Sequence, residues 1–374
     1  MSYLRSKGRP LAVVAALASS LALVAPATAD ASREHHRSHA GLAVQQVNLV
    51  SDVPGLAPLL DPDLVNPWGL SHGATTPLWS SNNGTSTSTL YASAAGATTA
   101  TKVPTVRVTV PLPTGQVNNP GTGFVLTKGT VSAPARFIFA TQTGQIAAWG
   151  PPVSPLIGAA EITATVPGAV YTGLTLATAK AGDQLYAANF AQRRIDVFDS
   201  KFGLVTQPHW AFRDPHLPRG YAPFNVQELN GKIFVAYAKV DPETGEELAG
   251  RGLGFVDKYS VEGRLLDRVV SRQSLNAPWG LAIAPSSWGE LAGSLLVGNF
   301  GDGRINVVRP KGHGRFDHHI KGQLRNSSTG ETLVIPGLWA LLQGTATTGG
   351  TDSIFFSAGI DDETHGLLGV LRKP

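Results

Sequence analysis

Two polar clusters hold the residues of this sequence that are best suited to chemistry. The first is Asp361-Asp362-Glu363-Thr364-His365, where carboxylates stand beside a histidine. Such a group can bind a divalent ion or move protons as an acid/base pair. We therefore take Asp362, Glu363 and His365 as candidate ligand contacts. An acidic, solvated hairpin turn is the simpler explanation of the same pattern.

The second cluster is Asp214-Pro215-His216-Leu217-Pro218-Arg219-Gly220-Tyr221. It combines charged and aromatic side chains in a stretch that precedes an apolar run, and binding residues gather in loops of this kind. The candidate ligand contacts here are Asp214, His216, Arg219 and Tyr221. The alternative is a rigid loop, braced by its prolines, that seals the domain.

A third motif, Gly69-Leu70-Ser71-His72-Gly73, fits G-x-S-x-G, the turn that presents the nucleophile in α/β-hydrolases. That role needs a strand followed by a helix, and no helix is expected here. At the equivalent place, Gly280 to Ala284 has no serine. We interpret Gly69 to Gly73 as an ordinary part of a β-strand repeat.

The elements that must position these residues are short strands. From Asn276 to Gly312 the runs Trp279–Ile283, Ser294–Phe300 and Ile305–Val308 are separated by turn residues, which predicts a small antiparallel sheet. Similar units open near residues 66, 119, 171, 221, 276 and 337. In the second unit we expect the first strand at Phe124 to Leu126.

Two of these units match closely, as LYAANFAQRRIDVF from residue 185 and LLVGNFGDGRINVV from residue 295. Asn189 and Asn299 end a strand at a turn in both, which indicates a structural role because asparagine side chains bond to turn backbone. Repeats of 50 to 60 residues predict a propeller. An unpaired strand at Ala43 to Val50 can close the ring. The fold predicted is all-β, a six-bladed β-propeller with its N-terminal strand in the last blade.

The N-terminal residues indicate export. Arg5, Lys7 and Arg9 precede an apolar run from Leu11 to Ala25, and Ala27-Thr28-Ala29 suits a signal peptidase, so we expect cleavage after Ala29. Residues 30–42 are expected to be a flexible segment, and residues 43–374 one domain. No later stretch is long and apolar enough to span a bilayer. The mature chain is therefore expected to be secreted and monomeric.

Charge and composition exclude several function classes. The formal net charge of +4 includes three cations of the signal region, so about +1 remains on the mature chain. Without a basic stripe, nucleic acid is not an expected partner. The chain contains no cysteine, which excludes a lipid anchor, a disulfide framework and C-x-x-C-H haem attachment.

A metal site on the propeller axis is the remaining chemical hypothesis. Asn66, Asn119 and Asn276 are expected just before the first strand of three blades, where amide oxygens could help to bind calcium. Calcium needs about six to eight oxygen ligands, and the other three units offer no carboxylate there. No cofactor is therefore expected, with calcium as the alternative.

The chain resembles NHL-type six-bladed propellers in its W-G-L openings and in LYAANF followed by IDVFD. It is more similar to a family of secreted, uncharacterised bacterial propeller proteins, through stretches spread over almost the whole mature chain. These are NPWGL at 66, DPHLPRGYAPFNVQ at 214, NAPWGLAIAP at 276, LLVGNFGDGRIN at 295 and ETHGLLG at 363. The resemblance implies fold and secretion, and it supplies no catalytic residue.

Two function classes follow. The favoured one is a binding module that presents loops to a glycan, a peptide or a surface protein. The alternative is a calcium-dependent hydrolase or lactonase with an ion in the central channel. The sequence carries no catalytic signature, and that absence favours binding.

Overall fold

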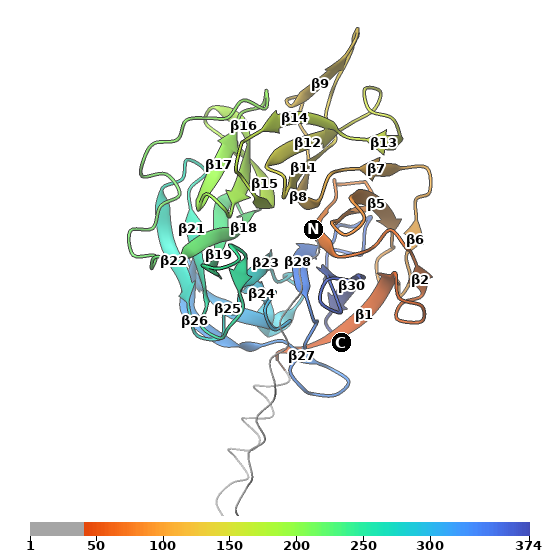
Figure 1. Ribbon diagram of the computed structural model, residues 1–374. Coiled ribbons are helices and arrows are strands. Elements are labelled where there is room, and N and C mark those ends of the chain that lie inside the picture. Colours follow the sequence, from red (N-terminus) through yellow and green to blue (C-terminus); the bar gives the residue numbers. More distant parts are fainter. Residues whose placement is uncertain (1–40) are drawn as a thin grey trace, which may run out of the picture. The chain divides into compact units, whose positions relative to one another are not determined.

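The computed structural model describes residues 41–374, which form sheets arranged around a common centre (Figure 1). The only helix in this part of the chain is the short 3₁₀ element η1 (Gly289–Leu291). No helix among residues 41–374 has the length and apolar character needed to cross a membrane. The expected signal peptide (1–29) and residues 30–40 of the segment expected to be flexible lie outside the described residues.

Six sheets form the six blades, and strands within a blade follow one another in chain order except in blade 6, whose outer strand comes from the N-terminal side of the ring. Blade 1 contains β3 (Pro67–Ser71), β4 (Leu78–Asn82), β5 (Thr87–Ala92) and β7 (Arg107–Thr109), and blade 2 contains β8 (Pro113–Asn118), β11 (Phe137–Thr141), β12 (Gln145–Trp149) and β14 (Glu161–Thr165). Blade 3 contains β15 (Tyr171–Ala179), β16 (Gly182–Asn189) and β17 (Arg194–Phe198), and blade 4 contains β18 (Tyr221–Leu229), β19 (Lys232–Val240), β21 (Gly254–Tyr259) and β22 (Leu265–Ser271). Blade 5 contains β23 (Pro278–Ile283), β24 (Leu295–Asn299), β25 (Ile305–Gly312) and β26 (Arg315–Gln323), and blade 6 contains β28 (Leu338–Gln343), β29 (Ser353–Ala358), β30 (Leu367–Arg372) and β1 (Ala43–Ser51). The first strands of adjacent blades contact one another around the ring, so β3, β8, β15, β18, β23 and β28 are the inner strands.

The remaining strands are short, and all of them except one separate hairpin extend the sheet of a blade. They are β2 (Leu59–Leu60), β6 (Thr101–Lys102), β9 (Val125–Lys128), β10 (Val131–Pro134), β13 (Ile157–Ala159), β20 (Glu247–Leu248) and β27 (Arg325–Asn326). One of them, β13, pairs with β7, so a strand from the blade 2 sequence extends the sheet of blade 1.

Ring closure occurs as predicted. β1 pairs antiparallel with β30, from Gln45 opposite Arg372 to Ser51 opposite Leu367, and forms the outer strand of blade 6. Without β1, the backbone N–H and C=O groups along the outer edge of β30 would be unpaired. Leu42 is also buried in the core, at 8% exposure, so the packed fold begins before Ala43.

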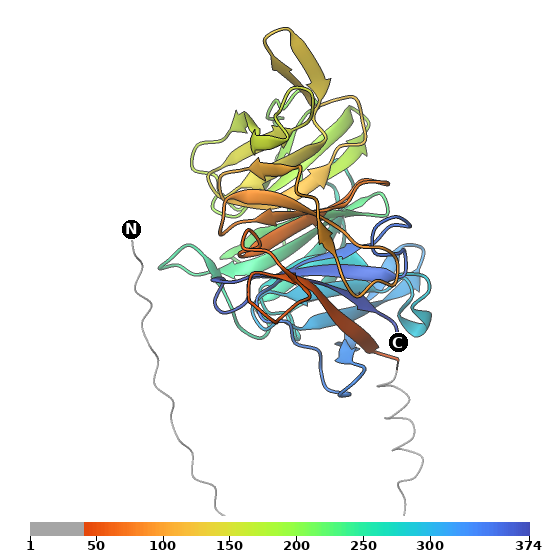
Figure 2. The ribbon, with the colours of Figure 1, turned by 90° about the vertical axis from the view of Figure 1, so that its right-hand side faces the viewer.

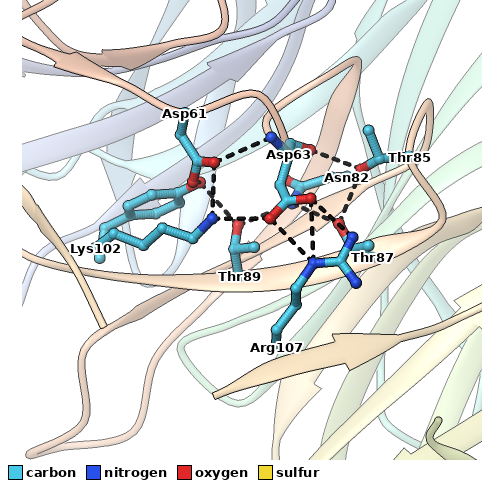
Figure 3. A network of polar contacts seen from close by, with 9 residues as sticks. Asp61, Asp63, Asn82, Thr85, Thr87, Thr89, Lys102 and Arg107 are labelled. Carbon is cyan, nitrogen blue, oxygen red and sulfur yellow. Dashed lines mark hydrogen bonds and ion pairs between the residues drawn. The ribbon is translucent and has the colours of Figure 1, made fainter. Parts of the chain in front are cut away.

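An ion-pair network fixes the segment between β1 and blade 1 (Figure 3). The ammonium of Lys102 lies 2.7 Å from Asp61 and 2.8 Å from Asp63, and Arg107 lies 2.8 Å from Asp63. Tyr91 donates to Asp61 at 2.7 Å. The hydrogen bonds from Arg107 lower the pKa of Asp63 to about 2. This closure network ties the chain leaving the last blade to the outer strands of the first.

The prediction for the first strand of blade 2 was wrong. The inner strand is β8, while Phe124 to Leu126 lies around the start of the β9–β10 hairpin, which projects from the ring (Figure 2). The sequence of β8 is polar and does not resemble a buried strand. Its polar side chains can be buried because they form hydrogen bonds with the backbone of neighbouring strands. Thr114 donates to Tyr171 O at 2.8 Å, and Gln116 donates to Gly69 O at 2.9 Å.

Each inner strand carries an irregularity against its second strand near its start. A bulge of this kind re-aims a side chain. The residues at or within it are Trp68, Thr114, Thr172, Phe224, Trp279 and Trp339, and the residues that follow them are Gly69, Gly115, Gly173, Asn225, Gly280 and Ala340. A Cβ placed on Gly115 would lie 2.1 Å from Leu174 N. Small residues therefore let the inner strands approach one another closely.

Candidate functional site

The central channel is closed at one end by aromatic side chains. We call Trp68, Trp279, Trp339, Phe224, Phe190 and Phe300 the aromatic plug, and they pack in one core cluster. The ring of Trp339 stacks between Trp68, at 3.7 Å between centroids, and Phe300, at 4.0 Å. Trp339 is completely buried. The tryptophans come from the starts of inner strands, so the plug closes the face of the ring where those strands begin, which we call the plug face.

Hydrogen bonds hold two of the plug's indoles in place. Trp279 donates to Thr172 O at 2.9 Å, which joins blade 5 to blade 3. Trp339 donates to Asn66 Oδ1, also at 2.9 Å. The indole nitrogen of Trp68 is buried and has no hydrogen-bond partner within residues 41–374. The plug is thus fixed by polar contacts across the ring as well as by stacking.

At the opposite ends of the inner strands the channel widens into a cavity of about 750 Å³, which we call the channel cup. Its lining comes from five of the six blades. The residues are Leu70, Ser71, His72, Gly73, Ala74, Gln116, Val117, Asn118, Pro120, Thr175, Leu176, Ala177, Thr178, Gln227, Glu228, Gly231, Val261, Leu342 and Thr345. Ligand sites are concave spaces of about 300–1,000 Å³ with a few polar groups among apolar ones, and the cup has this character.

Polar groups in the cup are held by the ends of the inner strands. Glu228 donates its backbone N–H to Thr175 Oγ1 at 2.9 Å, and its carboxylate accepts from Gly231 N. His72 Nε2 lies 2.7 Å from the carbonyl oxygen of Gln343, in blade 6. The side-chain amide of Gln227 makes no hydrogen bond within the described part of the chain. A half-buried amide without a partner is available to a ligand.

The serine of the G-x-S-x-G motif also lines the cup. Ser71 is the last residue of β3, and a turn follows it, so the strand-to-helix setting of a hydrolase nucleophile is absent from this place. Its hydroxyl is buried and makes no hydrogen bond within residues 41–374. An activated nucleophile needs a base within hydrogen-bond reach, so Ser71 is not arranged for catalysis.

The Asp361–His365 cluster lies away from the cup, in the turn between β29 and β30. His365 Nδ1 lies 2.7 Å from Asp52, and this hydrogen bond raises the pKa of His365. Asn66 donates to Glu363 at 2.9 Å. Asp361, Asp362 and Glu363 all have positive φ. The structure thus brings Glu363 and His365 to Asn66 and Asp52, and Asp362 projects from the same turn.

The Asp214–Tyr221 cluster lies at another place, beside blade 4. The Asp214 side chain is only 2% exposed and forms an ion pair with Arg268. Arg268 also contacts buried Asp257, whose pKa burial raises to about 7. Tyr221 is buried, whereas the side chain of His216 is 85% exposed.

These contacts fix the loop against its blade. Arg268 donates to His216 O at 3.3 Å, and Lys239 donates to Arg219 O at 3.2 Å. Of the four candidates, His216 and Arg219 are open to solvent. The observed packing favours the rigid-loop interpretation for Asp214 and Tyr221, because a buried side chain cannot meet a ligand.

The three asparagines do not form a ring. Asn66 and Asn276 precede inner strands, but Asn119 follows β8 and lies at the other end of the channel, so the expected correspondence was wrong for blade 2. Each amide oxygen already accepts an internal hydrogen bond, from Trp339 Nε1, Gly250 N and Gly121 N respectively. Among residues 41–374, no group of three or more His, Asp or Glu side chains is placed to hold a metal ion.

Two turn asparagines behave as predicted. Asn189 accepts from the backbone N–H of Gln192 at 3.1 Å and donates to Asp196. Asn299 donates to Ser274 O and to Asp302. Both side chains are therefore used in hydrogen bonds within the protein, which agrees with a structural role.

Comparison with known proteins gives a family but no activity. No protein-family model matches the chain. The uncharacterized protein R648 of Acanthamoeba polyphaga mimivirus is 32% identical over 332 residues, which cover 87% of this chain and 79% of that protein. The uncharacterized protein L690 of the same virus is 33% identical over 341 residues, covering 89% and 87%. This chain belongs to the family of R648 and L690.

A solved structure supports the propeller fold of this chain. The solved structure of a streptogramin B lyase aligns with 88% of this chain and 97% of its own, with a TM-score of 0.51 and 11% identity. At that identity the similarity shows the fold alone. R648 and L690 are viral proteins, so they do not support the expected bacterial family.

Proposed function

We propose that this protein is a non-catalytic binding module whose ligand occupies the channel cup. The observation that carries the proposal is the cup itself, a cavity of about 750 Å³ built from five blades, with a free amide at Gln227. Rigid inner strands position its polar groups, which limits the entropy lost when a ligand binds. A glycan or a peptide of the cell surface has the hydrogen-bonding groups that this lining requires.

Location outside the cell is part of the proposal. It is supported by the basic and apolar N-terminal runs that end at Ala27-Thr28-Ala29. N-terminal sequencing of the exported protein tests it, with Asp30 as the expected first residue. A protein that keeps residues 1–29 would contradict cleavage at this place.

An array of glycans and short cell-wall peptides tests binding. We expect Gln227→Ala to weaken binding of any hit severalfold, because the free amide is lost from the cup. Gln207→Ala is the matched control, since Gln207 lies in the irregular segment after β17 and outside the cup lining. A hit that binds both variants equally, or an array without a hit, would contradict the proposal.

A hydrolase or lactonase is the second candidate, and one observation favours it. Asp52 orients His365 through Nδ1, as a carboxylate orients a general base. Hydrolysis of lactones and esters, with and without calcium, would reveal such an activity, and His365→Ala should abolish it. Activity that persists in that variant would exclude this pair.

A further inference from the structure

The charge of the channel cup is one-sided. Glu228 is the only acidic residue in its lining, and the lining contains no lysine or arginine. A second carboxylate lies at the edge of the lining, because Thr178 of the lining donates to Asp183 at 2.6 Å. Lys180 follows β15 and Lys232 is the first residue of β19; both are exposed and lie outside the lining. A ligand inside the cup would therefore meet negative charge.

The available hydrogen-bonding atoms of the cup are mainly acceptors. A carbonyl oxygen can only accept, so His72 Nε2 carries the hydrogen that bonds to Gln343, and Nδ1 of the neutral ring is an acceptor. Asn118 uses Nδ2 to donate to Arg136 O at 3.1 Å, which leaves its Oδ1 as the acceptor. Glu228 uses one carboxylate oxygen for Gly231 N. The other oxygen makes no hydrogen bond within residues 41–374.

One further group in the lining lacks a partner. The hydroxyl of Ser71 is buried without a hydrogen bond, in a residue that is only 6% exposed. Buried polar groups in folded proteins are normally bonded, and an orphan calls for an explanation. Protein atoms cover this oxygen, so a ligand in the cup reaches it only if neighbouring side chains shift.

We propose that the channel cup binds a primary ammonium group carried by a small molecule with hydroxyl or amide groups. This inference rests on the proposed binding function and specifies its ligand. An ammonium has three donors and no acceptor, which suits a cavity whose lining offers the acceptors Glu228, His72 Nδ1 and Asn118 Oδ1. A carboxylate or phosphate ligand would face Glu228 with no cation in the lining to offset it.

Two sources carry this chemistry, an amino sugar and a lysine side chain. Ligand-observed NMR titration separates them with two matched pairs of probes. The first pair is glucosamine and glucose, and the second is N-acetyl-lysine methylamide and N-acetyl-norleucine methylamide. The expected result is binding of one ammonium probe at least tenfold tighter than its neutral partner.

Glu228→Gln tests the charge itself. Glutamine keeps the shape and an oxygen that can accept from Gly231 N, so the fold should be retained, and circular dichroism checks this. A hydrogen bond to a charged group is stronger than a neutral one, so the ammonium probe should bind about tenfold more weakly to this variant. The neutral probes should be unaffected. Glu243→Gln, in the exposed turn after β19, is the control.

The outcomes separate the two proposals. If a neutral ligand binds as tightly as its ammonium partner, or Glu228→Gln changes nothing while Gln227→Ala weakens binding, the ammonium inference is overturned and the cup remains a binding site. If neither ammonium probe binds, the inference is overturned. If array hits are also insensitive to Gln227→Ala, the proposed function fails with it.

Discussion

Replacing Trp339 by phenylalanine should destabilise the fold through one hydrogen bond. Trp339 is fully buried in the aromatic plug, and its indole donates to Asn66 Oδ1 at 2.9 Å. Phenylalanine can keep part of the stacking on Trp68 and Phe300, but it leaves the oxygen of Asn66, a residue only 5% exposed, without this donor. An unsatisfied buried acceptor costs about 1–3 kcal/mol.

Trp68→Phe is the matched control. It replaces an indole of the same plug by the smaller phenyl ring. No hydrogen bond is lost, because the indole nitrogen of Trp68 has no hydrogen-bond partner within residues 41–374. Each variant also loses apolar volume. Truncation of a buried tryptophan to alanine costs about 3–5 kcal/mol, so the smaller loss from indole to phenyl should cost roughly 1–2 kcal/mol. The free energy of unfolding should therefore fall by about 1–3 kcal/mol more for Trp339→Phe than for Trp68→Phe.

Guanidinium unfolding followed by far-UV circular dichroism measures this difference, with the slope of the transition checked for each variant. Equal destabilisation by the two substitutions would refute the reasoning, because it would mean that volume alone determines the cost. A larger loss for Trp68→Phe would refute it as well.

Two more predictions concern ring closure. Deleting residues 43–50 should lower the melting temperature markedly, because Val44, Leu49 and Val50 are at most 1% exposed and burying each such side chain contributes about 1.5–3 kcal/mol; an unchanged melt would contradict closure by β1. The pKa of Asp63 is lowered from 3.8 to about 2, so its ion pairs stabilise the fold fully above pH 4 and lose this effect as the pH falls toward 2. Asp63→Asn should cost about 1–2 kcal/mol at pH 7 and flatten the stability curve between pH 4 and 2, measured by unfolding at each pH, and an unaltered acid limb would rule out this role.

The propeller could be predicted because each repeat carries residue types that its inner strand requires. Each W-G-L opening combines a bulged aromatic residue with a glycine that the neighbouring inner strand forces to be small, so both are legible along the chain. β8 has the same geometry but places Thr114 where four of the other five blades have an aromatic residue. Its polar character misled the prediction, because those side chains bond to neighbouring backbone across the ring.

The candidate sites depend on contacts that are distant in sequence. His365 was identified, but its partner Asp52 lies 313 residues away, and nothing near Asp52 marks it. The cup was missed because residues such as Thr175, Gln227 and Glu228 are unremarkable singly and meet only when five strands end at one opening. The spacing of these residues along the chain does not indicate that they line one cavity.

The pairing of β1 with β30 constrains the order of events during synthesis. The strand that completes blade 6 leaves the ribosome before every other strand of the propeller, and the strand that receives it leaves last. Until then β1 cannot form its native pair, so nascent chains carry an unmatched hydrogen-bonding edge at each end. A chain terminated before β30 cannot finish the ring, and its exposed edges would mark it as a substrate for chaperones or proteases.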